Sequence, residues 1–460
     1  MKSLNQLPEI AVRRRYEIPK VILATLALLG LLALVGLGCY VGFWQLWAGY
    51  HHRQAHQAIA RRDFEAAHAH LCLCLEIWLH SAETEFETAR VARRAGRYAE
   101  AEKHLKICKE LRWAPESVEL EQVLLQAQRG HTQKYEDVMV DWINREHPDS
   151  VLILEAFSWG YIKNYELVHA LQCLEIWLKK EPDNVQALIW RGDARERMRR
   201  MEDAAEDYSR AVELDPDNEQ ARRLLANYLI YSHQGTSAIE HFQWLRQRFP
   251  SDPGVLLGLA RSMQEIGRPE EAGQLVDQLL EEDPRDAMAL SEKGRLAMEE
   301  GKFTEAENWL RKAVALAPYE KETLFSFWQC LEKQQKFDEA KKWKARFDQV
   351  DIDLIRMTEV MMQIRQTPRD PNLRLQAGKL LIENAQDVEG LRWLDSALQQ
   401  DPNHQPTRQY LAAYFEKRGD QRRAAYFRQT ANVEGAGVSL QGNVSPLLQK
   451  SGRIDSPRMP

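Results

Sequence analysis

Five prolines recur along this chain at a constant interval of 34 residues, and this interval limits the possible folds more than any motif does. The series runs through Pro182, Pro216, Pro250, Pro284 and Pro318. Six alanines keep the same interval, at Ala170, Ala204, Ala238, Ala272, Ala306 and Ala340. A constant period of this length arises when similar supersecondary units stack and each buries its apolar face only against its neighbours. The sequence therefore predicts a repeat array, an architecture that offers a binding surface more often than a catalytic centre.

The repeating unit reads as two helices joined by a turn. In residues 185–218 we expect helix A over about 185–198 and helix B over about 202–214, and Pro216 cannot continue helix B. Small residues recur at repeat position 8, namely Gly192, Ala226, Ala260, Gly294, Gly378 and Ala412, and the alanines above occupy position 20. They allow helices A and B to approach closely. Larger residues at position 24 should fill the space between repeats, and these are Leu174, Tyr208, Phe242, Val276 and Leu310.

Segments 203–218 and 304–318 are similar to helix B of the tetratricopeptide repeat (TPR) family. In this register the repeats begin at Trp47/Ala48, Ala82, Glu116, Val151, Val185, Glu219, Pro253, Ala287, Lys321, Pro371 and Gln405. The resemblance implies an all-α fold, a right-handed TPR superhelix (α-solenoid) of about eleven helix–turn–helix repeats. The small positions of repeat three hold Val123 and Tyr135, and position 8 of repeat nine holds Trp328, so we expect changed packing angles there.

The phase of the repeat jumps once, because Lys321 and Pro371 are separated by 50 residues, 16 more than one period. The additional segment, 351–370, reads as helical. One interpretation is a longer helix B that repacks locally. The other is a hinge or a partner-contact segment, which exposed methionines would favour.

Residues 21–50 contain no charged side chain, and their apolar run 21–43 would span roughly 34 Å as a helix, enough to cross a bilayer. Trp44, Trp47 and Tyr50 follow it, as an interfacial aromatic belt would. We expect an uncleaved signal anchor with a transmembrane helix over 21–46 that continues directly into repeat one. The alternatives are a cleaved signal peptide, a lipoprotein signal ending at Cys39, and a buried core helix.

The balance of Lys and Arg on the two sides of this span favours a cytoplasmic N-terminus and an extracytoplasmic array, periplasmic at a bacterial inner membrane. The predicted organisation is a basic N-terminus (1–20), the span (21–46), repeats one to nine (47–350), the insert (351–370), repeats ten and eleven (371–431) and a disordered tail (432–460).

Composition argues against several classes of function. The formal net charge is −6 with both signs interspersed, so no basic stripe indicates a nucleic acid partner. Nucleotide-binding, hydrolase and metalloprotease motifs are missing, and we expect no catalytic residues, no enzyme activity and no cofactor. Cys74 and Cys108 both occupy position 27 and should be buried as small apolar residues.

His52 and His56 are four residues apart on one predicted helix, a spacing that can chelate a metal ion. The sequence around them offers no acidic or cysteine ligand at a suitable spacing. We therefore expect surface histidines and no metal site.

The resemblance implies a ligand groove lined by positions 2, 5, 6, 9, 12 and 13 of helix A. A family subclass grips peptide carboxylates through basic and Asn residues; the nearest match, Arg223 and Asn227, is followed by Gly258, Met288 and Glu292 and fails. The candidate groove residues are Trp159, Trp190, Asp193, Arg223, Asn227, Tyr231, Arg261, Arg295 and Phe325. Their mixture of aromatic and charged groups favours a protein partner or an extended peptide.

These features together predict a single-pass, membrane-anchored TPR scaffold or adaptor. The chain resembles bacterial envelope TPR proteins that assist assembly or secretion. A cytosol-facing import or chaperone-docking receptor is the alternative, against which the failed carboxylate grip counts, and an enzyme with a hidden catalytic site comes last. A related envelope regulator ends in a zinc-binding rubredoxin-like module, but this chain has no CxxC pair. The oligomeric state stays open.

Overall fold

The computed structural model describes residues 20–79 and 81–428, and within them the chain forms 22 α-helices, one 3-10 helix and no strand. The all-α expectation is confirmed. The predicted basic N-terminus and disordered tail lie outside the described residues, apart from Lys20 at the start of the first helix. The chain divides into two compact bodies at residues 125/126.

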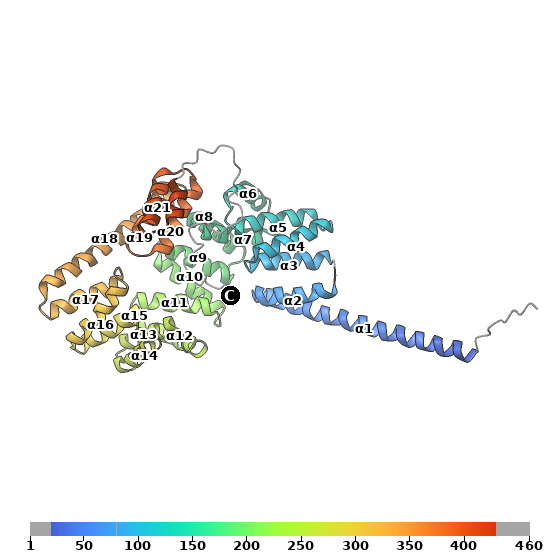
Figure 1. Cartoon of the computed structure of the whole chain (residues 1–460), viewed down its shortest axis with the longest axis horizontal. Helices are drawn as coiled ribbons and strands as arrows, with labels where there is room; N and C mark the ends of the chain where they lie inside the picture. Colours follow the sequence, from blue (N-terminus) through green and yellow to red (C-terminus); the bar gives the residue numbers. More distant parts are fainter. Residues whose placement is uncertain (1–19, 80, 429–460) are drawn as a thin grey trace, which may run out of the picture. The chain divides into compact units, whose positions relative to one another are not determined.

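The N-terminal body holds repeats one and two (Figure 1). Its helices are α1 (Lys20–Ala60), α2 (Phe64–Ile77), α3 (Ala82–Arg94), α4 (Tyr98–Glu110) and most of α5 (Pro115–Gln128). Cys74 and Cys108 are buried, and their thiols lie 3.3 Å and 3.8 Å from the carbonyl oxygens of Ala48 and Ala82. Their expected role as buried small residues is confirmed.

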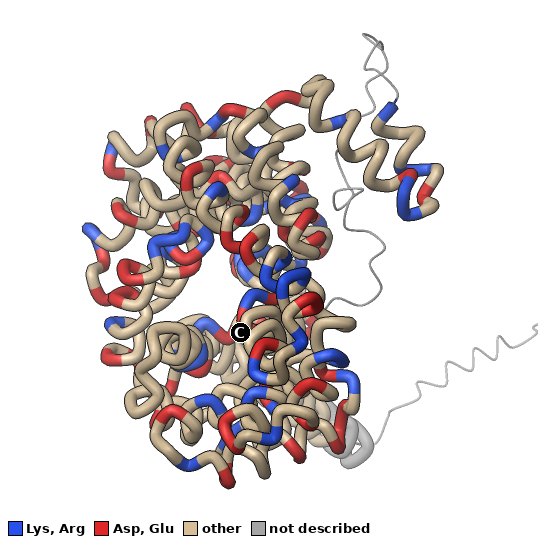
Figure 2. Tube along the Cα trace, turned by 90° about the vertical axis from the view of Figure 1, so that its left-hand side faces the viewer, with Lys and Arg blue, Asp and Glu red and all other residues tan. Residues whose placement is uncertain are grey.

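The C-terminal body continues the alternation of A and B helices. Its elements are η1 (Gln133–Tyr135), α6 (Glu136–Asn144), α7 (Ser150–Lys163), α8 (Leu167–Lys180), α9 (Val185–Arg197), α10 (Met201–Leu214), α11 (Glu219–Tyr231), α12 (Gly235–Arg248), α13 (Pro253–Glu265), α14 (Pro269–Glu282), α15 (Ala287–Glu299), α16 (Phe303–Leu316), α17 (Lys321–Lys333), α18 (Phe337–Gln366), α19 (Pro371–Glu383), α20 (Asp387–Gln400), α21 (Gln405–Lys417) and α22 (Gln421–Arg428). Acidic and basic residues are interspersed along these helices (Figure 2).

The A helices begin at side-chain caps that follow the same period as the prolines. Asn184, Asn218, Asp252 and Asp286 each accept a hydrogen bond, of 2.9–3.0 Å, from the backbone N–H three residues later. Such a cap satisfies one of the amide groups that have no partner within the helix. A proline lies two residues before each of these four caps and cannot continue the preceding helix B, so the boundary between helix B and the next helix A is set locally.

The expected close approach of helices A and B at position 8 is confirmed, and the small residue there faces the position-24 side chain of the same repeat. A Cβ built on Gly192 would lie 2.3 Å from Cε1 of Tyr208, and one on Gly378 would lie 2.6 Å from Cδ2 of Leu394. The position-24 residues Leu174, Tyr208, Phe242, Val276 and Leu310 are all buried. In repeat three, where Tyr135 replaces the small residue at position 20, helix B is divided into η1 and the nine-residue α6.

Helix α18 carries the phase jump. It is one continuous 30-residue helix, so residues 351–366 prolong helix B of repeat nine. Met357, Met361 and Ile364 on this extension are buried with Leu171 of α8 and Trp393 of α20. The extension therefore does not repack only locally, because it joins repeat four to repeat ten within the C-terminal body.

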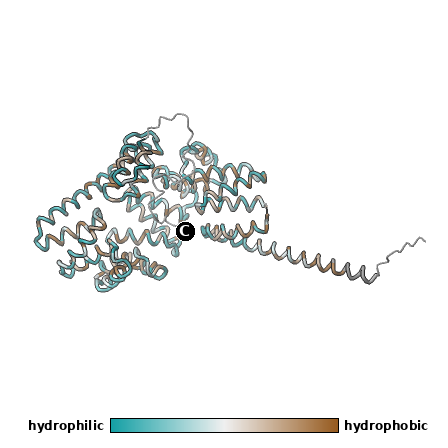
Figure 3. The backbone as a smooth tube through the Cα atoms, viewed as in Figure 1, coloured by the Kyte–Doolittle hydropathy of each residue, from teal (hydrophilic) through white to brown (hydrophobic). Residues whose placement is uncertain are grey.

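Helix α1 is, among the described residues, the one helix long and apolar enough to cross a membrane. Leu32, Leu34, Leu37 and Phe43 are each at least 58% exposed, and Figure 3 shows the hydrophobic stretch along α1. The helix passes from this stretch into helix A of repeat one without a break, as expected from the sequence.

Candidate functional site

Successive A helices contact each other in one register, through position 9 of one repeat and position 6 of the next. In the N-terminal body His56 meets Glu87 at 3.3 Å, and Arg90 meets Glu121 at 3.3 Å. In the C-terminal body Arg261 meets Glu292 at 3.3 Å, and the rings of Trp159 and Trp190 lie 5.2 Å apart. These positions belong to the groove face that the TPR resemblance implies, so many groove residues also hold neighbouring repeats together.

The tryptophans illustrate this double use. Trp190 of α9 is 8% exposed and lies between Trp159 of α7 and Trp177 of α8, 6.0 Å from the latter ring. Trp159 is half-buried. In the structure, Trp190 packs between neighbouring helices, whereas one side of Trp159 stays accessible.

Two of the candidate arginines are paired within the array. Glu292 is 2% exposed and accepts hydrogen bonds from Arg261, at 3.3 Å, and from Arg295. Arg261 also reaches Glu322 at 3.1 Å. A buried carboxylate needs such partners, since an unpaired buried charge is strongly destabilising. In the sequence, Glu292 stands out only because it does not fit the carboxylate grip. The pairing could have been predicted from the pattern, because a basic residue at position 9 of one repeat is followed by an acidic residue at position 6 of the next repeat.

Helix α11 presents two accessible candidate residues on this face. Asn227 is exposed and Tyr231 is 60% exposed. Arg223 is half-buried, pairs with Asp252 at 3.1 Å and lies over the ring of Phe249. On the preceding A helix, Asp193 pairs with Arg197 at 3.0 Å.

Phe325 belongs to an aromatic cluster on α17 and α18. It is 41% exposed, and its ring lies 5.6 Å from Trp328 and 5.7 Å from Phe347. Trp328 Nε1 is buried without a hydrogen-bond partner among the described residues. The cluster therefore combines an apolar surface with a tryptophan, a residue type that often anchors a protein partner.

The junction of repeats four and ten holds a second polar site inside the C-terminal body. Arg374 is fully buried and donates to the carbonyl oxygen of Tyr165 at 3.0 Å. Burial lowers the pKa of Arg374 to about 10, and burial raises the pKa of Glu166 nearby. A cavity of about 440 Å³ opens beside them, and its lining comprises Glu136, His169, Thr367, Pro368, Arg369 and Asp370. None of these residues was singled out from the sequence, because the two repeats are about 200 residues apart.

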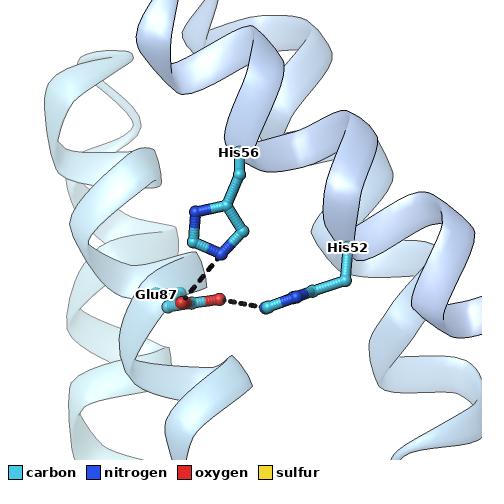
Figure 4. Close-up of side chains that lie close together, drawn as sticks. All are labelled: His52, His56 and Glu87. Carbon is cyan, nitrogen blue, oxygen red and sulfur yellow. Dashed lines mark hydrogen bonds and ion pairs between the residues drawn. The ribbon is translucent and has the colours of Figure 1, made fainter.

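The expectation that no acidic ligand accompanies His52 and His56 is wrong. Glu87, on helix A of the next repeat, places Oε2 2.7 Å from Nε2 of His52 and Oε1 3.3 Å from Nε2 of His56 (Figure 4). On α1 itself, no acidic residue lies three or four residues from either histidine. The stacking of A helices instead brings in a carboxylate 31 and 35 residues away.

Comparison with protein families identifies the repeats. Three tetratricopeptide repeat profiles match residues 169–219, 229–296 and 289–320. The chain is a tetratricopeptide repeat protein. Repeats of this kind indicate a scaffold for protein–protein interaction, which is the part of the functional prediction that these matches support.

This TPR protein is similar to a curated human relative, protein O-mannosyl-transferase TMTC3, with 27% identity over 248 residues, 52% of this chain and 25% of the relative. The mouse protein of the same name is 32% identical over 143 residues, 30% of this chain and 15% of the relative. The chain thus spans a quarter or less of the length of these relatives. The transferase activity in the name is stated of those relatives and not of this chain.

Solved structures with similar folds include YrrB, described as a TPR protein with an unusual peptide-binding site, at 18% identity over 40% of this chain and 94% of that chain, with a TM-score of 0.35. PilW, a type IV pilus biogenesis factor, is 17% identical over 43% and 91%, with a TM-score of 0.36. Human IFIT1, solved with m7Gppp-AAAA, is 18% identical over 75% and 88%, with a TM-score of 0.35.

Proposed function

We propose that this protein is a single-pass, membrane-anchored scaffold or adaptor that holds an extended segment of a partner protein against its A helices. The observation that carries the proposal is the exposure of Tyr231, at 60%, on the A-helix face of α11. Tyrosine gives a partner both apolar contact and a hydrogen-bonding hydroxyl, and such residues dominate the binding energy of many interfaces. Asn227 beside it and Phe325 on α17 extend the accessible set.

The membrane part of the proposal rests on α1. Within the described residues its leucines and Phe43 are exposed, and a bilayer would remove them from water. Because α1 continues into repeat one, the array would begin at the membrane surface. We place the array on the extracytoplasmic side of the membrane, as the Lys/Arg balance favours. A role in assembly or secretion at a bacterial envelope follows from the resemblance to envelope TPR proteins.

A photocrosslinking residue at Tyr231 in the full-length, membrane-inserted protein tests the binding face. We expect a crosslink to one partner protein from position 231 and none from Gln274, an exposed position on helix B α14 that serves as the control. Equal capture from both positions, or products within the same chain only, would contradict the proposed face.

Protease protection of the array in sealed cells tests its location separately. We expect that permeabilising the outer membrane alone exposes the array to added protease. If only disruption of the inner membrane exposes it, the array faces the cytosol and the receptor alternative replaces the periplasmic scaffold.

A further inference from the structure

Three potential ligand atoms converge where α1 meets α3. His52 and His56 lie one turn apart on the same face of α1, and both Nε2 atoms face the carboxylate of Glu87 on α3 (Figure 4). The three ligand atoms all lie within 4.8 Å of one another. Two imidazoles from α1 and one carboxylate from α3 can therefore chelate one metal ion together.

The distances suit a Zn²⁺ ion with little rearrangement. Nitrogen and oxygen ligands bonded at about 2.0–2.1 Å to a tetrahedral zinc ion lie about 3.4 Å from one another. The two His–Glu separations are now 2.7 Å and 3.3 Å, so small side-chain rotations would admit the ion. The side chain of His56 is 53% exposed, which leaves an entry path and room for a water molecule as fourth ligand.

The surroundings already orient one of the ligands. The ring of His52 packs edge-on against Trp78, with centroids 5.4 Å apart. Trp78 in turn donates its Nε1–H to Gln45 on α1 at 2.7 Å. A ligand held this way loses little side-chain entropy when a metal binds.

Two other repeats hold an ion pair between the same two positions. At the equivalent position 9, repeats two and seven carry Arg90 and Arg261, and each faces a position-6 glutamate of the next repeat. An arginine is always protonated and cannot ligate a metal, whereas a neutral imidazole can. Opposite Glu87 of repeat two, repeat one presents two imidazoles in place of a permanent positive charge, so a bound cation would supply the missing charge.

We propose that His52, His56 and Glu87 bind one Zn²⁺ ion, which clamps the base of the membrane-proximal helix α1 to helix A of repeat two. Its role would be structural, holding the first two repeats in register where the anchor enters the array.

The test uses the full-length protein in detergent, stripped with a chelator and titrated with Zn²⁺ against a chromogenic competitor. We expect one tight site per chain and a rise in the melting temperature with Zn²⁺. Co²⁺ should give the intense visible absorption of a tetrahedral site.

The variant His56→Arg introduces the residue that repeats two and seven carry at this position and keeps an ion pair with Glu87, so it should fold. It should weaken Zn²⁺ binding by more than the roughly 10–100-fold that follows loss of a supporting hydrogen bond around a metal site. Glu87→Gln should weaken it as well. His104→Gln removes a histidine that pairs with Glu85 at 2.5 Å elsewhere in the same body, and it should bind Zn²⁺ normally.

Three results would overturn the proposal. One is that the wild-type protein binds no stoichiometric Zn²⁺. Another is that folded His56→Arg binds Zn²⁺ as tightly as the wild type. The last is loss of the site in His70→Gln alone, which would transfer it to the His51–His70 pair, whose Nδ1 atoms lie 2.9 Å apart.

Discussion

At the scale of single residues, the turn from helix A to helix B requires a left-handed backbone once in every repeat. In repeats five to nine the residues are Arg199, His233, Gly267, Gly301 and Gln335, with φ between 56° and 79°, again 34 residues apart. A side chain in this region costs about 1–2 kcal/mol, which glycine avoids. The array therefore uses glycine in some repeats and tolerates strain in others.

We predict that Gly301→Ala lowers the free energy of unfolding by about 1 kcal/mol, since φ at this position is 74° and, apart from its two chain neighbours, no residue comes within 4 Å of the added methyl group. Urea unfolding followed by circular dichroism measures it. Gln335→Gly, the reverse change at the equivalent turn, should not destabilise the chain. Equal losses in both variants would show that backbone strain is not the cause.

A second residue-scale prediction concerns pH. Burial and the adjacent Arg222 guanidinium, 3.3 Å away, lower the pKa of His241, while Glu240 raises it by a smaller amount. A histidine whose pKa is lower in the folded state takes up its proton first in the unfolded state. Stability should therefore decline as the pH falls below about 6.5. The melting temperature of His241→Gln should decline less between pH 7.5 and 5.5 than that of the wild type, and parallel curves would refute this assignment.

At the scale of helix pairs, the close approach of helices A and B depends on small residues at their contact rather than on helix propensity. Gly192 of α9 faces Tyr208 of α10, and a Cβ there would overlap the ring at 2.3 Å. Gly273 of α14 has nothing within 4 Å of the same position. Both glycines lie inside helices. Replacing each of them with alanine therefore separates the effect of overpacking from the effect of helix propensity.

We predict opposite signs for this pair. Gly192→Ala should destabilise by about 1–3 kcal/mol through overpacking. Gly273→Ala should stabilise by roughly 0.5–1 kcal/mol, because alanine is the better helix former. Thermal unfolding of the two variants checks this, and a stabilised Gly192→Ala would mean that the helices can separate without cost.

At the scale of the whole molecule, the main feature is that α18 and α20 pack against α8, so that repeat ten contacts repeat four within the C-terminal body. Met361 on α18 is 2% exposed in the cluster with Leu171 and Trp393, whereas its neighbour Met362 is 53% exposed. The extension of α18 thus presents one methionine to repeat four and one to solvent.

We predict that Met361→Ala costs about 2–5 kcal/mol, as removal of a buried side chain does, and speeds hydrogen exchange in α8. Met362→Ala should change stability by no more than about 0.5 kcal/mol. Unaltered exchange in α8 of the Met361 variant would show that the contact between repeats four and ten contributes little.

The sequence alone determined the elements of this protein and their pairing within each repeat. These features depend on residues that are close together in the chain, so the sequence pattern predicts them directly. They are the small residues at position 8, the large residues at position 24 and the prolines after helix B. The continuous helix α1 was predictable for the same reason, because its apolar stretch and helix A of repeat one follow each other directly in the sequence.

Only the tertiary structure decided what lies opposite each exposed or polar side chain. Glu87 joins His52 and His56 because stacking superimposes successive A helices, and Arg374 reaches Tyr165, 209 residues away, because α18 bridges the two repeats. Small differences in packing angle accumulate along a solenoid. Residues far apart in sequence are therefore brought together by the sum of many local angles, which the 34-residue period does not specify.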